Sequence, residues 1–249
     1  MKTYYVNKQY RQAIYVGLMV ALSFGLVGAY AIDELLRSNG LVSMFLKVIY
    51  IACLLCYVTL RHEWSMMWRK VHFGWYLFAC APTLLLFGCQ VTPVQVPTNI
   101  NFGILVLNVA NVLITVIWEE LFFRYVSRTV FEDDGKYRIT DILCMVYIFM
   151  LPHLLNLIFQ SSELVCFQLI LAFSVGLLWL VLYRKTDCLL VSMIAHFTQN
   201  FAVFLSSLFS TADAVPYAGK FGVIIAYASM VIFCVGSSYV ICRRNRYLM

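Results

Sequence analysis

Long apolar runs fill most of the chain and alternate with short polar connections. An α-helix needs about 20 residues to cross the roughly 30 Å of hydrocarbon in a bilayer, and these runs have that length. Barrel strands would alternate polar and apolar residues, whereas these runs are continuously apolar. The pattern predicts an all-α, polytopic membrane protein with about eight transmembrane helices. The predicted spans are 13–32, 41–60, 73–91, 103–123, 139–159, 164–182, 189–209 and 222–242.

The polar connections are short, so we expect one membrane-embedded domain over residues 1–249. The longest connections are predicted at 92–102, 125–138 and 210–221. The acidic run from Glu132 to Asp134 is expected to be a solvated loop.

Basic residues gather on every second connection, which predicts the orientation of the chain. Only Arg37 and Lys220 lie in the alternate connections, and Lys47 and Arg124 fall inside predicted spans. Because Lys and Arg accumulate in cytoplasmic loops, both termini are predicted to be cytoplasmic. The remaining basic residues lie in the two terminal segments and in the connections predicted on the same side of the membrane as the termini. They are Lys2, Lys8, Arg11, Arg61, Arg69, Lys70, Arg128, Lys136, Arg138, Arg184, Lys185, Arg243, Arg244 and Arg246.

Composition supports this interpretation and excludes other classes. The chain is 63% apolar and 12% charged, whereas about a quarter of the residues of a soluble domain are charged. An aromatic content of 16% excludes disorder. The net charge of +6 is accounted for by the loop residues, so no nucleic-acid partner is predicted. The nine cysteines lie mostly in predicted spans and are interpreted as small apolar residues.

Charged residues interrupt the fourth span near its cytoplasmic end. Glu119, Glu120 and Arg124 lie there, and each charge near the bilayer centre costs about 2.5 to 3.5 kcal/mol. Glu120 and Arg124 are four residues apart and are predicted to pair on one helix face. Glu119 is rotated by about 100° from Glu120, so it is free to point separately into the bundle.

Two histidines fall inside other spans and are candidate partners for the spare carboxylate. His153 follows Pro152, which is expected to open the helix backbone beside a cavity. His196 and Asn200 are four residues apart and therefore share a helix face. Each residue alone is explained as well by helix packing, but together they indicate a functional cavity. Lys47 has no obvious partner and is assigned no role.

The combined groups suit hydrolysis. A buried glutamate is a usable general base for water, an imidazole can orient that water, and His196 with Asn200 can donate to an oxyanion. No G-x-S-x-G or H-E-x-x-H motif is present. Two histidines with one or two glutamates are also a zinc ligand set, and this alternative stays open.

Three ordered motifs resemble those of a known family. They are E-E-x-x-x-R at Glu119 to Arg124, F-x-x-x-H at Phe149 to His153, and H-x-x-x-N at His196 to Asn200. The set resembles the CAAX protease and bacteriocin-processing family, also called CPBP or Abi, which includes the type II CAAX prenyl endopeptidases. The motif-bearing core covers about 103–209.

The resemblance implies an intramembrane glutamic protease with an eight-helix fold and a conical cavity open to the cytoplasm. It implies that Glu119 is the base, that His153 is its partner on the water, and that His196 and Asn200 stabilise the oxyanion. Glu120 and Arg124 would support this site, with Phe149 beside them. No cofactor and no catalytic metal are implied.

The predicted function is therefore an intramembrane endopeptidase acting on a membrane-associated peptide or protein. A bacteriocin or peptide-pheromone precursor is one candidate substrate. The alternative is a non-catalytic immunity or regulatory protein of the same family. A proton-coupled transporter is disfavoured because no inverted repeat is evident. The lipid bilayer is the other expected partner, the oligomeric state is not predicted, and a bacterial plasma membrane with a cytoplasm-facing site is expected.

Overall fold

The computed structural model describes residues 2–38, 40–89, 101–132, 138–209 and 219–244, and every regular element in these ranges is a helix. The predicted all-α class is confirmed. Short π and 3-10 segments join the α-helices: η1 (3-10, Trp64–Met66), η2 (π, Leu121–Val126) and η3 (3-10, Leu151–Ile158). The α-helices are α1 (Lys2–Leu36), α2 (Leu41–Leu60), α3 (Phe73–Cys89), α4 (Phe102–Glu120), α5 (Ser127–Phe131), α6 (Ile139–Met150), α7 (Ser162–Thr186), α8 (Leu189–Phe209) and α9 (Gly219–Arg244).

Seven helical stretches in the described ranges are long and apolar enough to cross a membrane. The remaining predicted span, 73–91, corresponds to α3, whose 17 residues make it a shorter apolar helix. The chain is therefore a multi-pass membrane protein by length and composition, close to the eight spans predicted. The orientation of its termini stays a prediction.

Two predicted boundaries are wrong. Helix α1 begins at Lys2, well before the predicted start at residue 13. Residues 125–131, predicted as part of a polar connection, continue the α4 helix through η2 and α5. This continuation is possible because polar side chains there find partners in other elements. The connections predicted at 92–102 and 210–221 lie largely outside the described residues.

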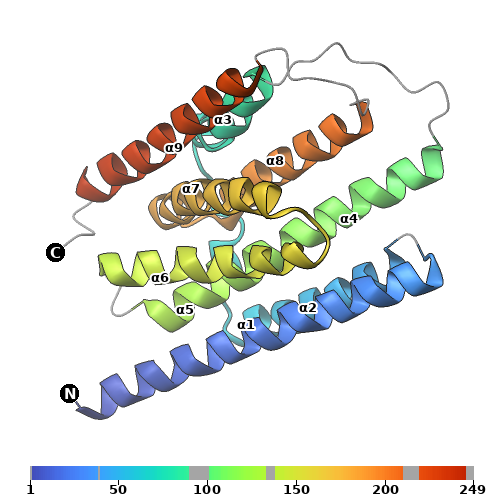
Figure 1. Cartoon of the computed structure of the whole chain (residues 1–249). Helices are drawn as coiled ribbons and strands as arrows, with labels where there is room; N and C mark the ends of the chain where they lie inside the picture. Colours follow the sequence, from blue (N-terminus) through green and yellow to red (C-terminus); the bar gives the residue numbers. More distant parts are fainter. Residues whose placement is uncertain (1, 39, 90–100, 133–137, 210–218, 245–249) are drawn as a thin grey trace.

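Helix α7 is the centre of the bundle. It packs against α3, α6, α8 and α9, and most of its C-terminal half is buried. Trp179 of α7 donates a hydrogen bond from its indole nitrogen to the carbonyl of Ala79 in α3, at 3.2 Å. Figure 1 shows α3 and α9 on one side of α7 and the antiparallel pair of α1 and α2 on the other, beyond α4 and α6. The helices of the second and third motifs, α6 and α8, pack against α7, and α4 packs against α8.

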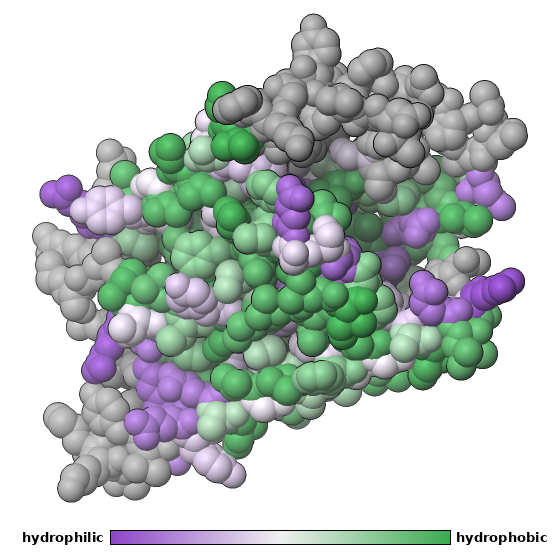
Figure 2. Space-filling view, in the orientation of Figure 1, coloured by the Kyte–Doolittle hydropathy of each residue, from purple (hydrophilic) through white to green (hydrophobic). Residues whose placement is uncertain are grey.

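The outer surface is apolar between two more polar ends. Large apolar side chains such as Phe24, Phe45 and Ile232 are mostly exposed, as expected for a surface that faces lipid. Figure 2 shows this apolar band along the helices, with hydrophilic residues gathered toward the ends. The N-terminal end of α1 and the C-terminal end of α9 lie at the same end of the bundle (Figure 1). We call this the terminal end, and the end that carries the turn from α1 to α2 the opposite end.

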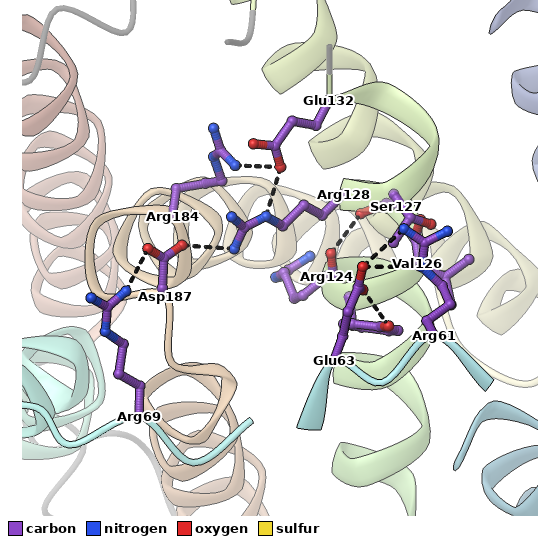
Figure 3. A network of polar contacts seen from close by, with 12 residues as sticks. Arg61, Glu63, Arg69, Arg124, Val126, Ser127, Arg128, Glu132, Arg184 and Asp187 are labelled. Atoms are coloured by element: carbon purple, nitrogen blue, oxygen red, sulfur yellow. Dashed lines mark hydrogen bonds and ion pairs between the residues drawn. The ribbon is translucent and has the colours of Figure 1, made fainter. Parts of the chain in front are cut away.

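A polar network closes the terminal end (Figure 3). Glu132 accepts hydrogen bonds or ion pairs from Arg128 and Arg184, both at 2.6 Å. Asp187, at the C-terminus of α7, pairs with Arg128 at 2.8 Å and with Arg69 at 3.0 Å. The prediction of a solvated loop is therefore wrong for Glu132, because neighbouring helices bring two guanidinium groups to it. Asp133 and Asp134 lie outside the described residues.

Candidate active site

Helix α4 places the two glutamates on different faces. The Glu120 side chain is completely buried, whereas the Glu119 side chain keeps 18% of its surface exposed and lines the main cavity. Consecutive residues of an α-helix point about 100° apart, which accounts for the separation. The π-helix η2 begins immediately after Glu120, and π segments inside helices often mark functional sites.

His196 of α8 lies between the two carboxylates. Its Nδ1 is 2.9 Å from Glu120 Oε1, and its Nε2 is 3.5 Å from Glu119 Oε2. The Glu120 contact fixes the ring, because a carboxylate accepts the hydrogen of Nδ1. The Nε2 atom is then directed toward Glu119 and the cavity.

Arg124 compensates the buried charge of Glu120. Its Nε lies 3.7 Å from Glu120 Oε2, and both side chains are completely buried. The predicted pair is thus present, although at this separation it is an ion pair without a hydrogen bond. The guanidinium carbon lies 4.3 Å from the centre of the Phe149 ring, close enough for a cation–π contact.

Two aromatic rings hold the imidazole of His196. Trp179 stacks on it with ring centres 4.9 Å apart, and Phe149 meets it edge-on at 6.0 Å. Phe149 in turn requires Gly176, because a Cβ atom there would lie 2.9 Å from the Phe149 ring. Packing and charge together therefore fix the position of His196.

Pro152 changes the helix type just before His153. The α6 helix ends at Met150 and continues as the 3-10 helix η3, which contains both residues. Proline lacks an N–H and its ring clashes with the carbonyl four residues earlier, so the break follows from the sequence as predicted. His153 lines the same cavity, and its ring centre lies 5.5 Å from that of Phe149.

The cavity has a volume of about 720 Å³ and brings Glu119, His153, His196 and Asn200 together. Two buried atoms in its wall, Nδ1 of His153 and Nε1 of Trp118, have no hydrogen-bond partner among the residues described. Buried polar atoms cost free energy unless they are paired, so the cavity suits a ligand that carries polar groups.

The mouth of the cavity lies at the opposite end of the bundle. Its exposed lining residues include Glu34 at the end of α1 and Gln160 after η3. At its base, Trp118, Phe123 and Phe149 are buried. The cavity therefore opens away from the end that carries the chain termini and the polar network.

The structure thus brings together all the predicted site residues. Glu119, His153, His196, Asn200 and Phe149 line one cavity, while Glu120 and Arg124 lie directly behind it. Sequence reasoning missed Trp179 and Gly176, and it left Lys47, which also lines the cavity, without a role. The only sequence signal for Lys47 was its charge inside an apolar run, and no local signal marks Trp179 or Gly176, because their contacts join distant helices.

No group of three or more His, Cys, Asp or Glu side chains within the described ranges has an arrangement that could hold a metal ion. The predicted site residues that line the cavity carry a carboxylate, two imidazoles and an amide. These groups can move protons and donate hydrogen bonds.

Residues 101–202 match the family Rce1-like, described as Type II CAAX prenyl endopeptidase Rce1-like. The matched residues include all three motifs. No curated protein and no solved structure matches the chain.

Proposed function

We propose that this chain, whose residues 101–202 match the Rce1-like family of type II CAAX prenyl endopeptidases, is itself an intramembrane endopeptidase. It cleaves a membrane-associated peptide or protein with water activated by glutamate, without a metal cofactor. The observation that supports this most is the 3.5 Å contact between Glu119 and His196 in the wall of a cavity that also contains His153 and Asn200.

In the proposed reaction, Glu119 takes a proton from water while the water oxygen attacks the carbonyl carbon of the scissile bond. His153 orients this water. The carbonyl oxygen becomes an oxyanion, to which Nε2 of His196 and the amide of Asn200 donate hydrogen bonds. When the carbon–nitrogen bond breaks, the proton held by Glu119 passes to the leaving nitrogen, so the products are a carboxyl group and an amine.

The role of His196 requires a hydrogen on Nε2. This requirement is met when both ring nitrogens carry a hydrogen, so that Nδ1 donates to Glu120 and Nε2 donates to the oxyanion. Glu120 and Arg124 do not reach the cavity, so we assign them the positioning of His196 rather than contact with the substrate. Phe149 and Trp179 restrict the ring mechanically.

We further propose a bacterial plasma membrane as the location, and a bacteriocin or pheromone precursor as one candidate substrate. The cavity mouth bears on the orientation. Two of the predictions are incompatible: that the termini are cytoplasmic, and that the cavity opens to the cytoplasm. The cavity mouth lies at the end of the bundle opposite to the N-terminal end of α1 and the C-terminal end of α9. We propose that the basic residues set the topology, so the cavity opens on the face away from the cytoplasm.

The test uses purified protein in detergent with a panel of synthetic membrane-associated peptides, and mass spectrometry to identify the products. We expect cleavage by the wild-type protein and a loss of about 10²-fold or more in Glu119→Ala and His196→Ala. Glu163→Gln is the control, since this glutamate is exposed at the start of α7, outside the cavity. All variants should fold and insert normally.

Cleavage by Glu119→Ala at the wild-type rate would reject the proposal. Loss of activity with a chelator, restored by zinc, would favour the metal-dependent alternative. A non-catalytic immunity or regulatory protein would instead keep its cellular function in both active-site variants at equal abundance.

A further inference from the structure

A second hollow lies on the outer face of the bundle, between α3 and α9. These helices pack against each other (Figure 1), and the groove between them has a volume of about 620 Å³. It shares no lining residue with the main cavity. Its lining residues in α9 run from Ile232 to Ile241, mostly in the half of this span that is nearer the terminal end. The groove therefore opens toward lipid close to one surface of the membrane.

Aromatic rings form the walls of this groove. Phe78 of α3 lies against Phe233 of α9 with ring centres 5.4 Å apart, and Trp75 meets Phe78 edge-on at 6.1 Å. The space beside Gly236 is open, because a Cβ atom there would meet no neighbouring atom within 4 Å. A hydrocarbon chain is as apolar as these side chains. The walls therefore suit an acyl chain better than a polar, soluble ligand.

Basic residues lie beside the groove at the terminal end. Lys70 precedes the lining residue His72 by two positions, and Arg243 follows the lining residue Ile241 by two. Lys70 and Arg243 are both exposed, and within the described ranges neither forms an ion pair. Helices α3 and α9 contain no Asp or Glu. This rim of the groove is therefore positively charged.

His72 adds a neutral donor to the rim. Its Nδ1 accepts a hydrogen bond from the backbone N–H of Gly74 at 3.1 Å, so the hydrogen of the neutral ring lies on Nε2. Because the residue is exposed, this hydrogen can be donated to a phosphate oxygen. Helix α3 begins one residue later, at Phe73, and the N-terminus of a helix also favours an anion. Basic pockets between membrane helices on the cytoplasmic side bind the headgroups of anionic lipids in the same way.

We propose that the groove between α3 and α9 binds one anionic phospholipid. An acyl chain lies beside Gly236, and the phosphate group lies at the rim that Lys70, His72 and Arg243 form. This site is separate from the proposed reaction centre, so the proposal does not depend on the endopeptidase function. A soluble phosphate compound and a second copy of this chain are the alternative occupants, and the experiment below distinguishes them.

The experiment measures binding by native mass spectrometry of the purified protein in detergent. The probes are dioleoyl phosphatidylglycerol, which is anionic, dioleoyl phosphatidylcholine, which has the same chains and no net charge, and glycerol 3-phosphate, which has no chains. Gly236→Leu fills the groove, and we expect it to fold because its Cβ atom enters open space. Gly17→Leu is the matched control, since Gly17 has equally open surroundings but lies exposed on α1.

A second pair of variants tests the charged rim. Lys70→Gln combined with Arg243→Gln removes two charges and leaves the apolar walls intact. Arg11→Gln combined with Arg37→Gln is its control, because it also removes two exposed charges, both from outside the groove. Thermal unfolding of each variant shows whether it is folded.

We expect the wild-type protein and both controls to bind the first phosphatidylglycerol at least about tenfold more tightly than phosphatidylcholine. Gly236→Leu should bind phosphatidylglycerol at least about tenfold more weakly than wild type, because its side chain occupies the position of the acyl chain. The variant without Lys70 and Arg243 should bind the two lipids equally, because it keeps the groove and loses the charge.

Equal binding of the two lipids by wild type would overturn the proposal, as would a preserved preference in the variant without Lys70 and Arg243. Wild-type affinity for phosphatidylglycerol in folded Gly236→Leu would also overturn it. Binding of glycerol 3-phosphate as tight as that of phosphatidylglycerol would identify a soluble anion as the occupant. A wild-type dimer that becomes a monomer in Gly236→Leu, with lipid binding unchanged, would show that the groove joins two copies. If Gly236→Leu does not fold, the rim variants decide the outcome.

Discussion

At the scale of single residues, the two adjacent glutamates have different tasks. Glu119 faces the cavity, whereas Glu120 is enclosed between Arg124 and His196. A buried ion pair contributes little net stability, but removal of one partner leaves an uncompensated charge. Loss of Glu120 alone should therefore disturb both the stability of the fold and the position of the imidazole.

This division of tasks predicts a double-variant result. Glu120→Gln should destabilise the protein by about 3 to 5 kcal/mol, because it strands the buried guanidinium of Arg124. Adding Arg124→Met should restore most of the stability, since no charge is then left unpaired. Activity should stay low in both proteins, because His196 no longer has a carboxylate that accepts the hydrogen of its Nδ1 atom. Thermal unfolding and peptide cleavage, measured on the same detergent preparations, check both outcomes.

Recovery of activity together with stability in the double variant would contradict this assignment. It would mean that Glu120 only neutralises Arg124 and that aromatic packing by Trp179 and Phe149 is sufficient to position His196.

At the scale of elements, the change from α6 to η3 sets the direction of His153. A 3-10 helix turns about 120° per residue and an α-helix about 100°, so the two differ by about 60° over the three residues from Met150 to His153. Pro152→Ala removes the cause of the change and lets the α-helix continue. We expect stability to be kept and the turnover rate to fall at least about tenfold, because the ring leaves its position in the cavity.

Pro82→Ala is the matched control for this prediction. Pro82 also lies inside a helix, α3, but it does not line the cavity. Its replacement should leave turnover unchanged. Wild-type turnover in Pro152→Ala would show that the 3-10 segment does not position His153.

Several features of the elements could be predicted because they depend on neighbours in the sequence. The apolar runs predicted the helices, the four-residue spacing predicted the pair of Glu120 and Arg124, and Pro152 predicted the local break. The contacts of Lys47 with Thr115 and of Trp179 with His196 could not be predicted, because they arise only when helices distant in sequence pack together. The same packing extends the α4 helix to Phe131, since Arg128 and Glu132 find ion-pair partners on α7.

At the scale of the whole molecule, the network at the terminal end makes stability depend on pH. Burial alone would raise the pKa of Glu132. The hydrogen bond and charge of Arg184 and the charge of Arg128 outweigh burial, so the pKa of Glu132 lies below the usual value of 4.5. A carboxyl group whose pKa is lower in the folded state stabilises the fold above its unfolded pKa. This contribution is lost as the pH falls through the folded value.

We therefore expect the unfolding temperature of the wild-type protein to fall between about pH 6 and about pH 3 more steeply than that of Glu132→Gln. At pH 6 the variant should be less stable than wild type by about 1 to 2 kcal/mol, because it loses the charge of the carboxylate between two arginines. The loss is no larger because solvent screens this partly exposed carboxylate. Glu163→Gln, which changes an exposed glutamate at the other end of α7, should follow the wild-type curve. Parallel curves for wild type and Glu132→Gln would contradict the assignment.

The position of the cavity mouth relative to the basic residues gives a prediction about access. Lys70 lies at the terminal end and Glu34 at the mouth, and both are exposed. A reagent that reaches only one side of the membrane should therefore distinguish the two positions.

The experiment starts from a variant in which all nine cysteines are replaced. Glu34→Cys and Lys70→Cys are introduced into it separately, and intact cells are treated with a thiol reagent that does not cross membranes. If the basic residues face the cytoplasm, Glu34→Cys reacts directly and Lys70→Cys reacts only after permeabilisation. The reverse pattern would mean that the cavity opens to the cytoplasm and that the basic residues do not set the orientation. In the expected orientation a substrate must enter from the membrane or from its outer side, so a cytosolic peptide would be cleaved only after insertion or export.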